Sequence, residues 1–137
     1  MAEPIKLEVV TPEKYVVNEK AQIVMAPGTV GEFGVLRDHT PFLTSLKTGR
    51  LHYKDVSGKE SVVFVSGGFA EALPDRVTVL AESAERREDI DIDRAKAAME
   101  RAQKRLAGGK SEDIDFERAH AALIRAIERL KVAESKG

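Results

Sequence analysis

The feature that most constrains this chain is a change of apolar period beyond the middle of its 137 residues. Up to about Leu80, apolar residues alternate with polar ones in short runs, as they do in half-buried strands. After the segment AESAERRE they recur at steps of three and four, as they do on one face of a helix. Strands followed by helices, rather than alternating with them, predict an α+β protein built from two successive units.

The first unit is predicted to be an antiparallel β-sandwich or barrel. The segments IKLEV and AQIVM have the strand pattern, and RLHYKDVSGKESVVFV and FAEALPDRVTVL are typical of hairpins. Their turns are expected at Ser57-Gly58-Lys59 and Pro74-Asp75. Turn signals about every ten residues are typical of these all-β folds.

The second unit is predicted to be an antiparallel hairpin of two amphipathic helices. We place the boundary between residues 84 and 85, which gives units 1–84 and 85–137. Gly108-Gly109 should cap the first helix in a left-handed conformation. Much of the seam is alanine, which buries little area, so the hairpin should lean on another surface and detach from it readily. The expected apolar positions are Ile92, Ala95, Met99, Ala102 and Leu106, then Phe116, Ala119, Leu123, Ala126 or Ile127, and Leu130.

The helical unit also contains an internal duplication, because the segments that begin at Glu88 and Glu112 are identical at 12 of 19 aligned positions. The duplication repeats three arginines: Arg94, Arg101 and Arg105 correspond to Arg118, Arg125 and Arg129. Steps of seven and four keep each trio on one helical face. Two explanations stay open. The arginines are solvated and paired with nearby acids, or guanidiniums from both helices bind a polyphosphate, with Asp91 as an N-cap that helps to order the site.

Several other functions are disfavoured. The Gly-Lys-Ser at 109–111 resembles the end of a P-loop, but Lys104 stands where the first glycine belongs and lies in a predicted helix. Gly28, Gly31 and Gly34 lack the order and the following helix of a dinucleotide fingerprint, so we assign them to turns.

His39 has no neighbouring His or Cys for a metal site and no Ser/Asp arrangement for a catalytic triad. A formal net charge of -1 argues against nucleic-acid binding. The sequence has no cysteine, no bilayer-spanning apolar run and no signal peptide, so we expect a soluble chain of a reducing compartment.

Three segments together resemble the epsilon-subunit family of bacterial F-type ATP synthases. They are PGTVGEFGVLRDHTPFLTSLKTGRL, VSGGFAEALPDRVTVLAESAE and the Ala/Arg-rich hairpin, and the resemblance runs nearly end to end. It implies a ten-stranded β-sandwich that docks on the gamma subunit and the c-subunit ring as part of the rotor. It also implies a non-catalytic, peripheral subunit on the cytoplasmic side of the bacterial cell membrane. In that family the mobile hairpin folds on the sandwich, or extends along gamma toward the alpha and beta subunits and inhibits ATP hydrolysis.

Some bacterial members of that family bind ATP in the folded form through the motif I/L-D-x-x-R-A, which residues 90–95 match in full. The resemblance implies no required cofactor or metal, and ATP as a regulatory ligand. It assigns c-ring contacts to Glu32 and His39, with Arg37-Asp38 replacing the Pro-Gly common before that histidine. By position it implies an ATP site made by Glu85, Ile90, Asp91, Arg94, Ala95, Arg101, Arg125 and Arg129.

The alternative hypothesis is a free-standing nucleotide-sensing module, which would not co-purify with gamma. An enzyme that hydrolyses ATP itself is disfavoured, because the sequence offers no obvious general base beside the arginines and no P-loop serine for Mg²⁺.

Overall fold

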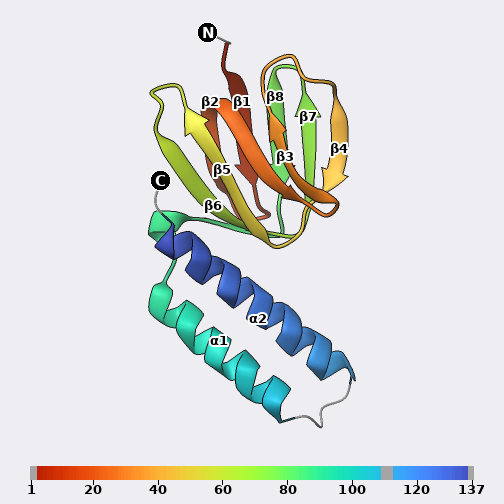
Figure 1. Ribbon diagram of the computed structural model, residues 1–137, viewed down its shortest axis with the longest axis vertical. Coiled ribbons are helices and arrows are strands. Elements are labelled where there is room, and N and C mark those ends of the chain that lie inside the picture. Colours follow the sequence, from red (N-terminus) through yellow and green to blue (C-terminus); the bar gives the residue numbers. More distant parts are fainter. Residues whose placement is uncertain (1–2, 109–112, 136–137) are drawn as a thin grey trace.

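The computed structural model describes residues 3–108 and 113–135, which form a sheet followed by a helical hairpin (Figure 1). The predicted order of strands and then helices is confirmed, with nine strands in the described residues where the resemblance implied ten. The strands are β1 (Ile5–Val10), β2 (Tyr15–Gly28), β3 (Gly31–Val35), β4 (Phe42–Ser45), β5 (Gly49–Asp55), β6 (Glu60–Ser66), β7 (Phe69–Leu73), β8 (Arg76–Leu80) and β9 (Ser83–Arg86). The helices are the 3-10 helix η1 (Arg87–Asp89), α1 (Ile92–Ala107) and α2 (Asp113–Glu134).

The described strands pair in the order β4-β7-β8-β1-β2-β5-β6-β9, and β3 pairs with β2. β1 and β8 run parallel, and the other pairs of neighbouring strands are antiparallel. The strand β2 is 14 residues long and pairs first with β1, then with β5 and β3. This sharing lets the sheet curve into a sandwich. Both predicted hairpins, β5–β6 and β7–β8, are present.

The sandwich closes around one apolar core, to which alternate residues of most strands contribute. In β1, for example, Ile5, Leu7 and Val9 are fully buried, whereas Lys6 is exposed. β6 departs from this alternation because Val63, Phe64 and Val65 are all buried. Val63 and Val65 belong to the sandwich core, and Phe64 points to the opposite face of the strand. That outer face of β6 is therefore covered as well.

The helices α1 and α2 pack against each other along the predicted alanine seam. Ala95, Ala102, Ala119 and Ala126 are buried. The larger predicted seam residues are only half-buried, namely Met99, Leu106, Leu123, Ile127 and Leu130, and the two outermost predicted positions are exposed. Ile92 and Phe116 are 45% and 51% exposed. Ile92 is the first residue of α1, so no earlier helical turn covers it.

The end of α1 differs from the prediction at Gly108. This residue is right-handed, with φ -65° and ψ -19°, and its N–H donates to the Lys104 carbonyl at 3.0 Å. The helical hydrogen bonding thus continues through Gly108 instead of closing in a left-handed cap there. Gly109 and the P-loop-like stretch at 109–111 lie outside the described residues.

The hairpin leans on the sandwich through the C-terminal end of α2. Val132, fully buried, packs with Phe64 of β6 and with Ile90, which precedes α1. The Arg87 guanidinium of η1 donates a hydrogen bond of 2.5 Å to the carbonyl of Ser135, just beyond α2. The entry into α1 and the exit from α2 therefore meet on one face of β6. The boundary expected between residues 84 and 85 falls within β9.

Candidate functional site

A cavity of about 590 Å³ lies where the helical hairpin meets the sandwich. Its walls come from the turn between β1 and β2, from β9, from α1 as far as Arg101 and from the last third of α2. Among the residues that the structure describes, positive and negative side chains line it in equal number. The cations are Lys14, Arg86, Arg94, Arg101 and Arg129, and the carboxylates are Glu13, Glu82, Glu85, Asp89 and Asp91.

The alternation of β9 decides which of its side chains reach the hairpin. Ala84 is buried in the sandwich core, while Ser83 and Glu85 both contact Arg129 of α2. Successive side chains of a strand point to opposite faces, so Arg86, like Ala84, borders the cavity from the sandwich side and does not reach toward Arg129. The strand thus offers one carboxylate and one hydroxyl to α2.

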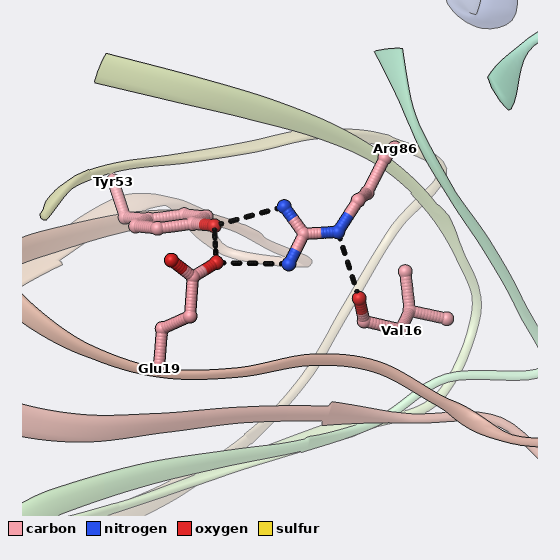
Figure 2. A network of polar contacts seen from close by, with 4 residues as sticks. All are labelled: Val16, Glu19, Tyr53 and Arg86. Carbon is pink, nitrogen blue, oxygen red and sulfur yellow. Dashed lines mark hydrogen bonds and ion pairs between the residues drawn. The ribbon is translucent and has the colours of Figure 1, made fainter. Parts of the chain in front are cut away.

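Arg86 anchors β9 to the sandwich, and Figure 2 shows its guanidinium between three acceptors. Nε donates to the Val16 carbonyl at 3.0 Å, Nη1 to the Tyr53 hydroxyl at 3.2 Å, and Nη2 to Glu19 Oε2 at 2.8 Å. The Tyr53 hydroxyl in turn donates to Glu19 Oε2 at 2.5 Å. These bonds tie β2, β5 and β9 together immediately before the chain enters η1.

This network fixes the charge states of its members. The hydrogen bond from Tyr53, and after it the one from Arg86, holds the pKa of the Glu19 carboxyl below its ordinary value. Burial, assisted by the bond to Glu19, raises the pKa of Tyr53. Glu19 is therefore ionised and Tyr53 neutral at neutral pH, and Arg86 is committed to the sandwich.

Arg129 forms the corresponding contact from the hairpin side. Its Nε donates to Glu85 Oε1 at 2.5 Å, and its Nη2 reaches the Ser83 hydroxyl at 3.5 Å. The guanidinium carbon lies 4.5 Å from the centre of the Phe64 ring, within cation–π range. One side chain of α2 thus binds a carboxylate of β9 and stacks on the outer face of β6.

The N-terminal end of α1 forms a further wall. Asp91 is the predicted N-cap, and its carboxylate accepts from the Arg94 N–H at 3.0 Å. Arg94 and Arg101 are seven residues apart, so they lie on one face of α1 and both line the cavity. The small side chains of Ala95 and Ala98 leave the space between them open. This wall presents two cations beside a helix N-terminus, an arrangement that favours anions.

Six of the eight residues assigned to an ATP site by resemblance line this cavity: Glu85, Asp91, Arg94, Ala95, Arg101 and Arg129. Ile90 does not, because its side chain packs with Phe64 and Val132. Arg125 lies outside the lining, as do the two other repeated arginines, Arg105 and Arg118. In this conformation the two arginine trios therefore contribute three members to one cavity.

Sequence reasoning missed the β1–β2 turn and Arg86, which also line the cavity. It missed Phe64 as the platform under Arg129 as well. The unbroken apolar run VVFV in β6 is the available signal for Phe64, since such runs indicate strands buried on both faces. No local pattern points to the turn, which lies some 80 residues before α1 in the chain.

Glu32 and His39 lie away from this cavity. Glu32 is in β3, with Oε2 3.4 Å from His52 Nε2, and His39 lies in the loop before β4. His39 Nδ1 is 2.7 Å from the Thr40 carbonyl. Asp38 has a left-handed φ of 66°, the conformation that glycine adopts most readily. Asp38 therefore adopts the backbone conformation that the glycine usual at this position would take.

In the part of the chain that the structure describes, no three His, Asp or Glu side chains are grouped to hold a metal ion. No helix among the described residues is long and apolar enough to cross a bilayer.

The fold defines a class of two-part proteins, a β-sandwich followed by a helical hairpin that packs against one edge of it. Two family models match these parts in turn. Residues 4–87 match the beta-sandwich domain of the ATP synthase Delta/Epsilon chain, and residues 88–134 match its long alpha-helix domain. The chain belongs to the ATP synthase delta/epsilon family.

Relatives of high identity within that family include bacterial epsilon chains. The ATP synthase epsilon chain of Desulfosudis oleivorans is 71% identical over 109 residues, covering 80% of this chain and 82% of that one. The epsilon chain of Desulforapulum autotrophicum is 68% identical over 107 residues, covering 78% of this chain and 79% of its own length. A chain in the cryo-EM structure of the Euglena gracilis mitochondrial ATP synthase has the same fold, with a TM-score of 0.82 at 23% identity, covering 98% of this chain and 84% of that one.

Proposed function

We propose that this chain is the epsilon subunit, a non-catalytic part of the central stalk, of a bacterial proton-translocating ATP synthase. Its sandwich would dock on gamma and on the c ring, with Glu32 and His39 facing the ring. The names of its high-identity relatives support this role, as does its structural neighbour from Euglena gracilis, which belongs to an assembly containing F1 and a c ring. As part of that complex it would lie on the cytoplasmic side of the cell membrane, as a peripheral subunit. The first test is co-purification of tagged epsilon with gamma, which a free-standing nucleotide sensor would not give.

The helical hairpin is the proposed regulatory part. In the closed form described above it rests on β6 and β9, and in an extended form it would reach along gamma to the alpha and beta subunits and inhibit ATP hydrolysis. The limited closed contact supports this role, because the C-terminal half of α2 rests on β5 and β6, and the cluster around Phe64 with the contacts of Arg87 and Arg129 attaches the hairpin there. Hydrolysis by the reconstituted complex, with and without residues 88–137, tests the proposal. Truncation should raise the rate, and an equal rate would remove the inhibitory role.

ATP is the proposed regulatory ligand, and the cavity between hairpin and sandwich is its proposed site. The observation that carries this proposal is that Arg94, Arg101 and Arg129, from both helices, line one cavity of about 590 Å³. Small-molecule sites commonly measure roughly 300–1,000 Å³. Guanidinium groups are well suited to phosphate oxygens because they donate in pairs.

Such a ligand would act by population shift, since the cavity exists only while the hairpin lies on the sandwich. If ATP binds the closed form alone, a concentration of about 100 times its Kd stabilises that form by roughly 2.7 kcal/mol. The open, inhibitory form would then become about a hundredfold rarer.

Calorimetric titration of the full chain with ATP, with and without Mg²⁺, tests the site directly. Arg94→Ala should weaken binding, and Arg105→Ala is its control because Arg105 lies outside the cavity. Arg125→Ala tests whether the cavity rearranges to include that side chain. Absence of heat at millimolar ATP would remove the sensor role and leave the stalk role standing.

A further inference from the structure

The sandwich contributes to the cavity a turn that no motif had marked. Residues 11–14, between β1 and β2, form one wall, and α1 forms another. The turn is closed by its own hydrogen bonds. The Thr11 N–H donates to the Lys14 carbonyl at 2.9 Å, and the Thr11 hydroxyl oxygen accepts from the N–H groups of Glu13 and Lys14, both at 3.3 Å. Pro12 further restricts the backbone. Lys14 is thus carried on a well-defined turn at the edge of the cavity.

The cations around the cavity fall into two groups. Arg86 and Arg129 are each bonded to a carboxylate, Glu19 and Glu85 respectively. Lys14, Arg94 and Arg101 make no ion pair with any residue that the structure describes. An incoming anion therefore meets three positive groups that are not engaged in ion pairs with described residues, two on α1 and one on the sandwich.

We propose that Lys14 is a phosphate-binding residue of this cavity, and that it completes from the sandwich side the cationic group that Arg94 and Arg101 begin on α1. This inference rests on the proposed nucleotide function and names the contact that makes binding specific to the closed form. A polyphosphate held by α1 alone could stay bound when the hairpin extends. A polyphosphate that also binds Lys14 loses that contact on opening, so Lys14 supplies part of the differential affinity that a population shift requires.

Neutralising the neighbouring Glu13 should change the affinity for an anion in the opposite direction to neutralising Lys14. Glu13 lies in the same turn and lines the same cavity, as do Glu82 and Asp89, so negative side chains oppose an anionic ligand there. Removing the charge of Glu13 should strengthen binding, whereas removing that of Lys14 should weaken it. A general disturbance of the turn would instead change both in the same direction.

The experiment uses the full chain with ATP and inorganic tripolyphosphate as probes. Lys14→Gln should raise the Kd of both about three- to tenfold, the scale of losing one charge-assisted contact at a partly solvated site. Glu13→Gln should lower it about two- to threefold. Lys14→Arg should bind within about twofold of the parent chain because the charge is kept. Lys20→Gln is the matched control, because Lys20 is an exposed lysine of β2 outside the cavity, and it should leave the Kd unchanged.

Energy transfer between dyes on the sandwich and on α1 gives a second readout. Without ligand, Lys14→Gln should close the hairpin as the parent chain does, but more ATP should be needed to close it fully. If the parent chain binds ATP and Lys14→Gln binds it equally tightly, the assignment of Lys14 is wrong while the nucleotide site stands. If the parent chain binds neither probe, the nucleotide function and the assignment of Lys14 both fall.

Discussion

Replacing Arg129 by methionine should open the hairpin even when no ligand is present. Methionine keeps much of the length and apolar stem of arginine but removes the guanidinium. The substitution therefore deletes the 2.5 Å bond to Glu85, the longer contact with Ser83 and the stack over Phe64, all of which join the hairpin to the sandwich. The packing of α1 on α2 should persist, since the alanine seam does not involve Arg129.

The size of the effect follows from the exposure of the groups. The side chains of Arg129 and Glu85 are 27% and 32% exposed, so solvent screens their attraction and the pair contributes about 0.5–1 kcal/mol. The stack on Phe64 contributes about as much again. A total of about 1–2 kcal/mol corresponds to a five- to thirtyfold fall in the ratio of closed to open hairpin.

The assay is energy transfer between two dyes on the isolated chain. Because the sequence has no cysteine, single cysteines introduced as Lys59→Cys on the β5–β6 turn and Gln103→Cys on α1 give unique labelling sites. Arg105→Met is the matched control: Arg105 is the counterpart of Arg129 in the duplication, is exposed and makes no ion pair with any described residue. Glu85→Gln should open the hairpin by a smaller amount in the same direction.

The reasoning would be refuted if Arg129→Met left the transfer distribution unchanged while Arg105→Met behaved in the same way. The contacts of Arg129 would then contribute nothing to closure, and the apolar cluster around Phe64 would hold the hairpin alone. A double-mutant cycle between Arg129 and Glu85 separates the ion pair from the stack, because only the pair depends on both residues.

Three further predictions concern the sandwich and its contact with the hairpin. The pKa of Glu19 is lowered in the folded chain, mainly by the hydrogen bond from Tyr53. The ionised carboxylate therefore contributes to stability at pH values above its ordinary pKa of 4.5, and this contribution is lost as the pH falls through the lower pKa of the folded state. Glu19→Gln should therefore reduce the fall in urea stability between about pH 5 and pH 3, and an unchanged pH slope would contradict this. Gly68→Ala should destabilise the sandwich by at least about 3 kcal/mol in urea, because φ is +101° and the new Cβ would meet a carbonyl of β8 at 1.9 Å. Gly58→Ala, at φ +88° in open space, should cost only about 1 kcal/mol, and equal losses would refute the steric argument. Val132→Ala should weaken the docking of the hairpin on the sandwich by about 1–2 kcal/mol, because it removes apolar contacts with Phe64 and Ile90. The measurement is amide exchange, which should become faster in α2 and stay the same in the sandwich. Unaltered exchange in α2 would show that Val132 does not help to hold the hairpin.

The sequence predicts those parts of the site that depend on local periodicity. Asp91 as N-cap, and Arg94 and Arg101 on one face of α1, follow from spacing along a single helix, and the structure has them as expected. The strand pattern likewise predicts the β5–β6 and β7–β8 hairpins, because alternation and turn residues act over short distances.

The rest of the site depends on how α2 is rotated against the sandwich. Arg125 and Arg129 share a helical face, yet Arg129 alone reaches the cavity, because Phe64 and Glu85 meet α2 near its C-terminal end. Lys14 is brought beside α1 by the parallel course of β1 and β8 and by the position of β9, which no short segment encodes. Ile90 is a second case in which the sequence motif does not predict the contact. It matches the first position of the I/L-D-x-x-R-A motif, but its side chain packs on Phe64 and does not line the cavity.

The attachment of α2 near one end gives the helix a mechanical role. At about 1.5 Å per residue, Phe116 lies roughly 20 Å along the helix axis from Arg129, so a tilt of about 10° around the anchored end moves Phe116 by roughly 3–4 Å. Sub-ångström repacking beneath the aromatic ring of Phe64 is thus magnified several-fold at the far tip. A substitution at the contact between Phe64 and α2 should therefore displace the N-terminal end of α2, near Phe116, more than the C-terminal end that rests on the sandwich.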